Sequence, residues 1–309
     1  MTRSLILRTL AALLVCVFAA APANAAMPAV TLPQAPNCPI FPSTNVWNKP
    51  VTGLNEHNNS DALMDSIGLD AYLHPDFSSV AGGNYGIPYN IVKAGAKKKP
   101  VRFTWPAESD RGPYPIPRRP RIEGGSDRHI LIVDRDACYL YELFAARKTS
   151  KGWRAGSGAI WNMRSNALRP EGWTSADAAG LPILPGLVRY DEVAAGEIRH
   201  ALRFTAEVTR RAYIYPARHF ASDYADPDLP PMGLRLRLKD TVDISGFGPQ
   251  SRVILRALRT YGMILADNGS SLYVTGAPDA GWDDDDLHDL HQINGDDFEV
   301  VDTSTLRNG

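Results

Sequence analysis

The stretch HILIVDRDACYLYELF at residues 129–144 determines the fold class expected for this protein. It begins with a β-branched run at residues 129–134, and a second apolar run at residues 138–144 follows after three intervening residues. Two strand-length runs at this spacing are typical of a β-hairpin. We therefore expect a β-rich core that begins near residue 121 and contains this hairpin.

Short strand-like segments continue along the rest of the chain. They lie at residues 153–161, 198–205, 212–215, 234–239, 263–266, 272–275 and 298–301. In LRLRLK, residues 234–239, the alternation is strict, which predicts leucines that face a core and cations that face water.

Helical patterns are few and short. The best one spans residues 251–261 and has an apolar face opposite its arginines, and a shorter one begins at Ser60. Many short strands separated by Gly- and Pro-rich turns predict an all-β or mostly β protein. The expected architecture is a β-sandwich of the jelly-roll or lectin–glucanase type with few short helices.

The first 25 residues have the pattern of a secretory signal peptide. Arg3 and Arg8 precede an apolar run at residues 10–21, and Ala-Asn-Ala ending at Ala25 supplies a small-residue cleavage site. No later segment approaches the ~18 uninterrupted apolar residues that a membrane span needs. We therefore expect a secreted or periplasmic protein, cleaved near Ala25 and without a membrane span.

Two cysteines, Cys38 and Cys138, remain after this cleavage. In an oxidising compartment they predict one disulfide. The bridge would close a loop of about a hundred residues and stabilise the fold by roughly 4–5 kcal/mol in the chain-entropy model. It would hold a Pro- and Gly-rich segment, residues 26–120, against a β-rich core at residues 121–309, so that residues 26–309 form one continuous domain.

The charge balance argues against nucleic acid as a partner. The chain has 33 Lys and Arg residues against 34 Asp and Glu residues, and loss of Arg3 and Arg8 leaves 31 basic residues. A near-neutral balance gives no electrostatic attraction to nucleic acid or to anionic membranes. The chain contains no G-x-S-x-G, H-E-x-x-H, Walker or G-x-G-x-x-G motif, which removes lipases, common metalloproteases and NTPases from the leading candidates. We expect no cofactor.

The densest polar cluster is EGGSDRH at residues 123–129, where a glycine turn enters the first core strand. Glu123, Asp127 and His129 lie within this cluster. Two carboxylates and an imidazole at the mouth of a sheet can supply a general acid, a general base and a partner that shifts their pKa values. The alternative is a polar turn in which Asp127 caps backbone amides.

A second candidate region, residues 161–182, combines tryptophans with polar residues. Trp161 and Trp173 can stack on the C–H faces of sugar rings while polar neighbours bind the hydroxyls. Asp177 lies near the start of an expected helical turn and is a candidate second carboxylate. The alternative is a capped connection with Trp173 packed in the core.

Three further residues, His200, Arg218 and His219, are candidates for substrate binding. They lie in or beside expected strands, so that they can line one cleft with His129. No short pair of ligands typical of zinc sites is present, and we expect no metal there. The acidic patch at residues 283–297 offers oxygen ligands for calcium but lacks the EF-hand pattern, so a solvated face is the preferred interpretation and calcium binding is left open.

Three blocks of this sequence resemble a family of secreted bacterial proteins. The blocks are GWTSADAAGLPILPGLVRYDEV at residues 172–193, HALRFT at residues 200–205 and PARH at residues 216–219. The resemblance extends over most of the mature chain and implies export and a single continuous domain. It implies no activity and no catalytic residue.

Two classes of function fit these residues, both with a polysaccharide or oligosaccharide as partner. The first is a secreted polysaccharide-active enzyme, expected to be a glycoside hydrolase in which Glu123 and either Asp127 or Asp177 form the carboxylate pair. A polysaccharide lyase is a close variant, in which a His or Tyr is the base and Arg218 neutralises a uronate. The second class is a carbohydrate-binding or envelope-associated protein without chemistry. A peptidase or esterase is a third hypothesis, weakened by the missing nucleophile motif.

Overall fold

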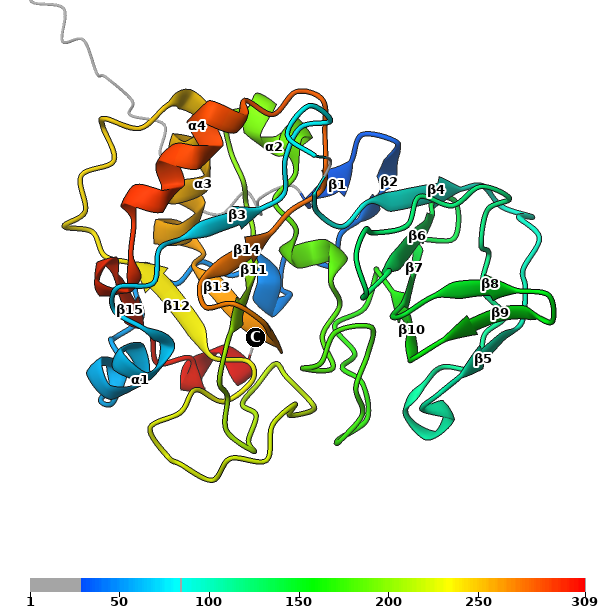
Figure 1. The fold of residues 1–309 in the computed structure, drawn as a ribbon, viewed down its shortest axis with the longest axis horizontal. Helices are drawn as coiled ribbons and strands as arrows, with labels where there is room; N and C mark the ends of the chain where they lie inside the picture. The colour runs from blue at the N-terminus through cyan, green and yellow to red at the C-terminus, as the bar shows by residue number, and fades with distance from the viewer. Residues whose placement is uncertain (1–28, 84, 309) are drawn as a thin grey trace, which may run out of the picture.

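The computed structural model describes residues 29–83 and 85–308, and its sheets form two lobes (Figure 1). Most of the regular structure is strand, arranged in several sheets with few short helices, so the predicted mostly β, sandwich-like fold class is confirmed. The expected signal peptide, residues 1–25, lies outside the described residues. Among the described residues, no helix is both long enough and apolar enough to cross a membrane.

The large lobe is built on a six-stranded mixed sheet. Its strands, in spatial order, are β15 (Phe298–Val300), β12 (Arg235–Leu238), β13 (Met263–Asn268), β11 (Leu202–Ala206), β14 (Tyr273–Thr275) and β3 (His74–Asp76). β11 runs parallel to β13 and β14 runs parallel to β3, whereas the other pairs are antiparallel. Alternate residues such as Phe204, Leu265 and Val274 belong to the main hydrophobic core.

The helices are short, and two of them match the expected segments. They are α1 (Ser60–Ile67), α2 (Tyr190–Ala194), α3 (Pro249–Thr260) and α4 (Asp284–His288), together with the 3-10 turns η1 (Val46–Asn48), η2 (Pro106–Glu108), η3 (Leu184–Gly186), η4 (Asp289–Gln292), η5 (Gly295–Asp297) and η6 (Ser304–Asn308). The apolar sides of α1 and α3 are buried in the main core, as their periodicity predicts. Gly262, which follows the α3 C-cap residue Tyr261, has a φ of +66°, a left-handed conformation that lets the chain turn straight into β13.

The small lobe is a layered β-structure. Its four-stranded sheet contains, in spatial order, β10 (Gly158–Asn162), β7 (Tyr139–Leu143), β6 (Ile130–Asp134) and β4 (Tyr89–Val92). Its three-stranded sheet contains β5 (Val101–Phe103), β9 (Gly152–Ala155) and β8 (Arg147–Thr149), and a two-stranded sheet contains β1 (Thr31–Leu32) and β2 (Ala35–Pro39).

Both faces of the four-stranded sheet are covered. Ile130 and Ile132 of β6 pack in the core that also holds residues of β5 and β9, whereas Leu131 and Val133 pack in the core that holds residues of β1 and β2. β6 and β7 pair antiparallel, which confirms the hairpin expected from residues 129–144.

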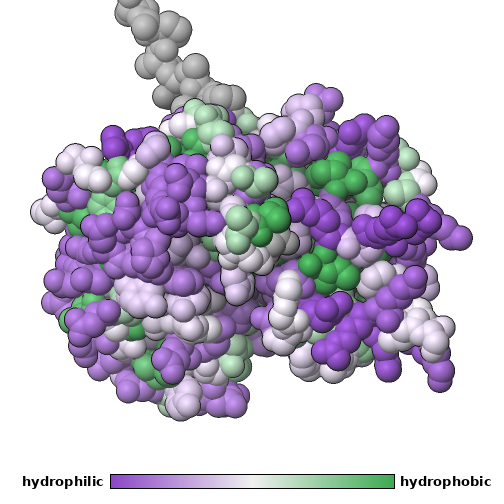
Figure 2. Space-filling model, turned by 45° about the horizontal axis from the view of Figure 1, so that its top comes forward, coloured by the Kyte–Doolittle hydropathy of each residue, from purple (hydrophilic) through white to green (hydrophobic). Residues whose placement is uncertain are grey.

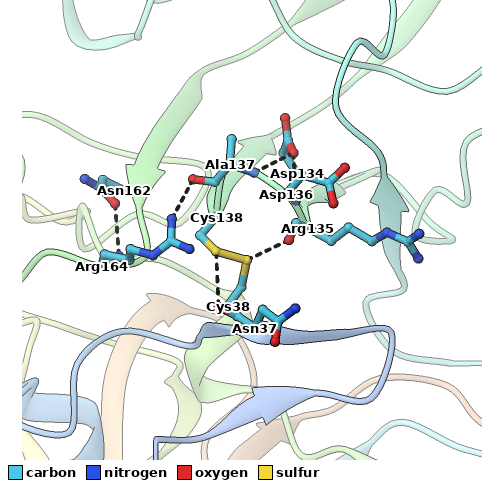
Figure 3. Close-up of a disulfide and its surroundings, with 9 residues drawn as sticks. All are labelled: Asn37, Cys38, Asp134, Arg135, Asp136, Ala137, Cys138, Asn162 and Arg164. Atoms are coloured by element: carbon cyan, nitrogen blue, oxygen red, sulfur yellow. Dashed lines mark hydrogen bonds between the residues drawn. A yellow bond between two sulfur atoms is a disulfide. The ribbon is translucent and has the colours of Figure 1, made fainter.

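The predicted disulfide joins Cys38 on β2 to Cys138 beside β7, with Cα atoms 5.2 Å apart (Figure 3). It fastens the N-terminal segment to the small lobe. That segment also supplies β3 to the large sheet and both β4 and β5 to the small lobe. Residues before 121 are therefore part of the sheets and do more than pack against them.

The expectation that the cations of residues 234–239 face water was wrong for Arg235 and Arg237, whereas the Lys239 side chain is 38% exposed. Arg235 is buried and donates to the carbonyl oxygens of Tyr261, Val46 and Lys49. Arg237 is half-buried and pairs with Glu299 on the adjacent strand β15. The strict alternation correctly places the leucines in the core, but the second face of β12 is covered by chain segments far away in sequence.

Candidate active site

Polar side chains from neighbouring strands meet on one face of the large sheet. Arg203 of β11 donates from Nη1 to the Thr275 hydroxyl of β14 at 2.6 Å. Thr275 is in turn the register partner of Asp76 on β3. Register partners on paired strands point to the same face of the sheet. One face of this sheet is therefore polar here, and the opposite face packs in the apolar core.

Arg203 contacts two carboxylates on this polar face. Its Nε and Nη2 donate to the two carboxylate oxygens of Asp177, each at 2.7 Å. Nη2 also lies 3.4 Å from Oδ2 of Asp267 on β13. The Asp177 side chain is fully buried, whereas 27% of the Asp267 side chain is exposed. Asp177 and Asp267 therefore share one guanidinium, and Asp267 is the one open to solvent.

Burial raises the pKa of Asp267 to about 7, and the negative charge of Asp177 acts in the same direction. The charges of Arg203 and His129 oppose this shift without cancelling it. A carboxyl group with a pKa near neutrality is partly protonated at the pH where many enzymes act. It can therefore donate a proton in catalysis.

Asp267 opens into a cavity of about 470 Å³, here called the central cleft, between the two lobes. The small lobe contributes Trp105, Glu108 and Phe144, and the large lobe contributes the segment 219–223. Glu108, Asp177, Asp223 and Asp267 are its carboxylates, and His219 is its imidazole. The cleft is therefore acidic, with aromatic rings on its walls.

Glu123, which is half-buried, and the buried His129 form a pair next to this cleft. The Nδ1 atom of His129 lies 2.6 Å from Oε2 of Glu123, and Nε2 lies 3.0 Å from the Ala176 carbonyl oxygen. Since a carboxylate and a carbonyl both accept, the two contacts together require a doubly protonated ring. Burial disfavours this charge, but the hydrogen bond and the charge of Glu123 raise the pKa of His129. The pair holds the backbone next to Asp177.

Of the predicted residues, Glu123 and His129 contact each other, and His129 reaches the Ala176 carbonyl, next to Asp177 in sequence. For Glu123, burial acts to raise the pKa, yet the hydrogen bond and the charge of His129 lower it. Glu123 therefore remains ionised in the pair. Asp127 lies apart on the exposed turn, where its carboxylate accepts from Ser126.

The remaining predicted binding residues divide between the cleft and other sites. His219 lines the cleft, donates from Nδ1 to the Ala178 carbonyl and stacks on Phe220. His200 is buried away from it, between the Ala201 carbonyl and the Glu192 carboxylate. Arg218 pairs with Glu171 at 2.5 Å. Of these three residues, His219 lines the cleft, as expected, whereas His200 and Arg218 do not.

The two predicted sugar-platform tryptophans bind a cation of the protein itself. Arg169 lies over both rings, 5.6 Å from the centroid of Trp161 and 5.4 Å from that of Trp173. Trp161 is also buried and donates from Nε1 to Glu142. The Trp161 ring therefore has no free face for a sugar. Arg169 accounts for the polar character of the loop, because its guanidinium bonds Asp110 and two backbone carbonyls.

The acidic patch at residues 283–297 is used largely for capping backbone amides. Asp283 caps α4, Asp286 accepts from the amides of the first turn of α3, and Asp284 accepts from the amide and hydroxyl of Ser79. In the described part of the chain, no group of three or more His, Cys, Asp or Glu residues is arranged to hold a metal ion.

Sequence reasoning missed Asp267, Arg203 and Glu108. Asp267-Asn268-Gly269 has the composition of a turn, and this signal obscured the carboxylate. A charged residue inside the apolar run Leu202–Ala206 was the available signal for Arg203, because such a residue is rarely buried unless it is paired.

Comparisons with protein-family models, curated proteins and solved structures found no match to this chain. The resemblance of the three sequence blocks therefore remains an expectation, and the site is interpreted from its own geometry.

Proposed function

We propose that this protein is a secreted polysaccharide-active glycoside hydrolase with Asp267 as its general acid. The observation that carries the proposal is the partly exposed Asp267 carboxyl in the central cleft, with a pKa raised to about 7 by burial and by Asp177. A carboxyl group in this state suits protonation of a glycosidic oxygen.

Asp177 supports this acid and does not itself react. Its nearest oxygen and that of Asp267 contact the same Nη2 atom, so they are no more than about 6 Å apart. Both Asp177 oxygens are nevertheless bound to Arg203, and the side chain is fully buried. Its charge favours the protonated form of Asp267.

Glu108 is the proposed base. It lines the same cleft, and its carboxylate lies 3.8 Å from Nε2 of His219. In the reaction, Asp267 gives its proton to the leaving oxygen while the C–O bond breaks. Glu108 removes a proton from the water that attacks the anomeric carbon, which inverts the configuration. After the reaction, Glu108 releases its proton to solvent and Asp267 takes up a proton from solvent, which restores the starting state.

Aromatic side chains favour a sugar as the substrate. Trp105 is 49% exposed, and Phe144 and Phe220 also line the cleft. The exposed face of Trp105 suits the C–H face of a sugar ring, so Trp105 takes the platform role that was expected of Trp161 and Trp173.

The charge of the cleft favours hydrolysis over uronate elimination. A lyase needs a free cation beside the uronate carboxylate, but Arg203 is paired with Asp177 and Arg218 with Glu171. Apart from His219, the ionisable groups that line the cleft are all carboxylates.

The test is product release from a panel of bacterial and plant polysaccharides, followed as new reducing ends and as the ultraviolet absorbance of unsaturated uronides. Asp267→Asn should lower kcat by about a hundredfold or more, the effect of removing a general acid. Asp65→Asn, an exposed carboxylate on α1, is the matched control and should leave kcat unchanged. In the wild type, kcat/KM should fall above about pH 7 as Asp267 ionises.

Uronide absorbance, or full activity in Asp267→Asn, would overturn the proposal. Retention on a polysaccharide without any cleavage would instead support a binding protein.

A further inference from the structure

Three arginines stand side by side on the three-stranded sheet of the small lobe. Arg154 on β9 is the register partner of Arg102 on β5 and also of Arg147 on β8. All three side chains are exposed. We call this set the arginine ladder. Adjacent strands are about 4.8 Å apart, so the guanidinium groups lie on one face at short spacing.

Within the part of the chain that the structure describes, the ladder has no paired counter-charge. In residues 85–308, none of the three guanidinium groups forms a salt bridge or a side-chain hydrogen bond. Two adjoining hollows of about 330 and 660 Å³ contain ladder residues, and no carboxylate of the described chain lines either of them. Like charges directly opposite each other destabilise a sheet. A bound anion would remove this repulsion.

The charge extends beyond the ladder. Residues 93–164 contain 16 Lys and Arg residues against 7 Asp and Glu residues. The pKa of Lys99 is lowered by burial and also by the positive charges of Lys148 and Lys97. Figure 2 shows hydrophilic side chains projecting from the side of the molecule that carries this lobe. The lobe therefore presents a surface of positive potential.

The ladder adjoins the central cleft. The larger hollow is lined by Thr104, Ala145 and Gly156. Each of these has a sequence neighbour that lines the cleft, namely Trp105, Phe144 and Ser157 respectively. The Trp105 and Phe144 rings stack with centroids 6.2 Å apart at this boundary. A polymer lying on the ladder can thus continue past these rings into the cleft.

We propose that the arginine ladder binds the carboxylate or sulfate groups of an acidic polysaccharide. The guanidinium group matches both anions through paired N–H donors. The identification of the polymer as a polysaccharide rests on the proposed function. A nucleic acid has a charge on every nucleotide and would bring phosphates against Glu108, Asp223 and Asp267. A polysaccharide with separated acidic groups can place neutral sugars there.

The experiment is native gel retardation of the full mature protein by polygalacturonate, dextran sulfate and neutral dextran at several salt concentrations. The wild type should be retarded by at least one acidic polymer and not by neutral dextran, less so as salt rises. The variant Arg102→Gln/Arg147→Gln/Arg154→Gln should bind about tenfold more weakly, the loss expected for three exposed ionic contacts.

The control is Arg111→Gln/Arg118→Gln/Arg119→Gln, which removes the same charge from exposed sites in the same lobe. Its affinity should change by less than about twofold, because these sites lie outside both hollows. Equal affinities of the wild type and the ladder variant would overturn the proposal, and so would equal losses in both triple variants. Tighter binding of duplex DNA or anionic vesicles at the same salt would also overturn it.

Failure of the proposed hydrolase activity has a different signature. Binding that depends on the ladder, without cleavage by the wild type, would refute the hydrolase and retain the ladder. Cleavage that depends on Asp267, with binding insensitive to the ladder variant, would do the reverse.

Discussion

Arginine has opposite roles in the two lobes. In the large lobe Arg203 and Arg235 are only 4% and 1% exposed, and each binds several acceptors of the protein. In the small lobe the ladder arginines are exposed and register with one another. A buried guanidinium requires acceptors because its dehydration costs several kcal/mol. An exposed one stays hydrated and available to a ligand.

The same contrast appears in the charge of the chain. Residues 165–309 contain 14 basic and 22 acidic residues, whereas residues 93–164 contain 16 basic and 7 acidic ones. The near-neutral total is the sum of two opposite regions. Net charge alone therefore says little about partners here, because a ligand contacts one surface at a time.

The largest effect is expected from breaking the buried pair. Asp177→Asn leaves the Arg203 charge without its bidentate partner, and the free energy of unfolding should fall by about 3–5 kcal/mol. Urea unfolding followed by circular dichroism measures this. A loss below about 1 kcal/mol would show that buried arginines in this protein do not need their partners.

The next effect concerns the attachment of the small lobe. Cys38→Ser/Cys138→Ser should lower the free energy of unfolding by about 2–4 kcal/mol, because the open loop regains entropy in the unfolded chain. Thermal melting with and without a mild reductant is the measurement. An unchanged melting temperature in the double variant would contradict the stabilising role of the bridge.

A smaller effect depends on pH. The pKa of Asp267 is raised from 3.8 to about 7 by burial and by Asp177, so its contribution to stability is complete below the ordinary value and is lost as pH rises through the raised one. Asp267→Asn should therefore gain about 1–2 kcal/mol relative to the wild type between about pH 4 and pH 7.5, less than the full shift implies because solvent screens the partly exposed carboxyl. Chemical unfolding at several pH values checks this. A difference independent of pH would refute the raised pKa.

The smallest effect is expected on the ladder. Arg154→Gln removes the central charge of three, and the free energy of unfolding should stay within about 0.5 kcal/mol of the wild type or rise slightly. Urea unfolding followed by circular dichroism measures this change, which is compared with the loss in Asp177→Asn. A loss comparable to that of Asp177→Asn would mean that the ladder is structural and would remove the distinction between the lobes.

Several parts of the fold follow from local patterns. The hairpin β6–β7, the apolar faces of α1 and α3 and the disulfide were all predicted. Each depends on residues close in sequence, or on the two cysteines that lie outside the expected signal peptide. For the candidate site, the sequence pointed to Glu123 and His129, which contact each other, and to Asp177 and His219, which line the cleft, but it missed Asp267.

By itself the sequence determined the β6–β7 hairpin, the two longer helices and which cysteines pair, because hydrophobic periodicity and chemical type act locally. Only the tertiary structure decided what each charge does. Arg203 lies 26 residues from Asp177 and 64 from Asp267, and Arg235 reaches carbonyls more than 180 residues away. Strand neighbours decide whether an arginine is buried among acceptors or left in water beside other arginines. A buried arginine is dehydrated and therefore stabilises the fold through its bonds to protein acceptors, whereas an exposed arginine stays hydrated and can bind an anion.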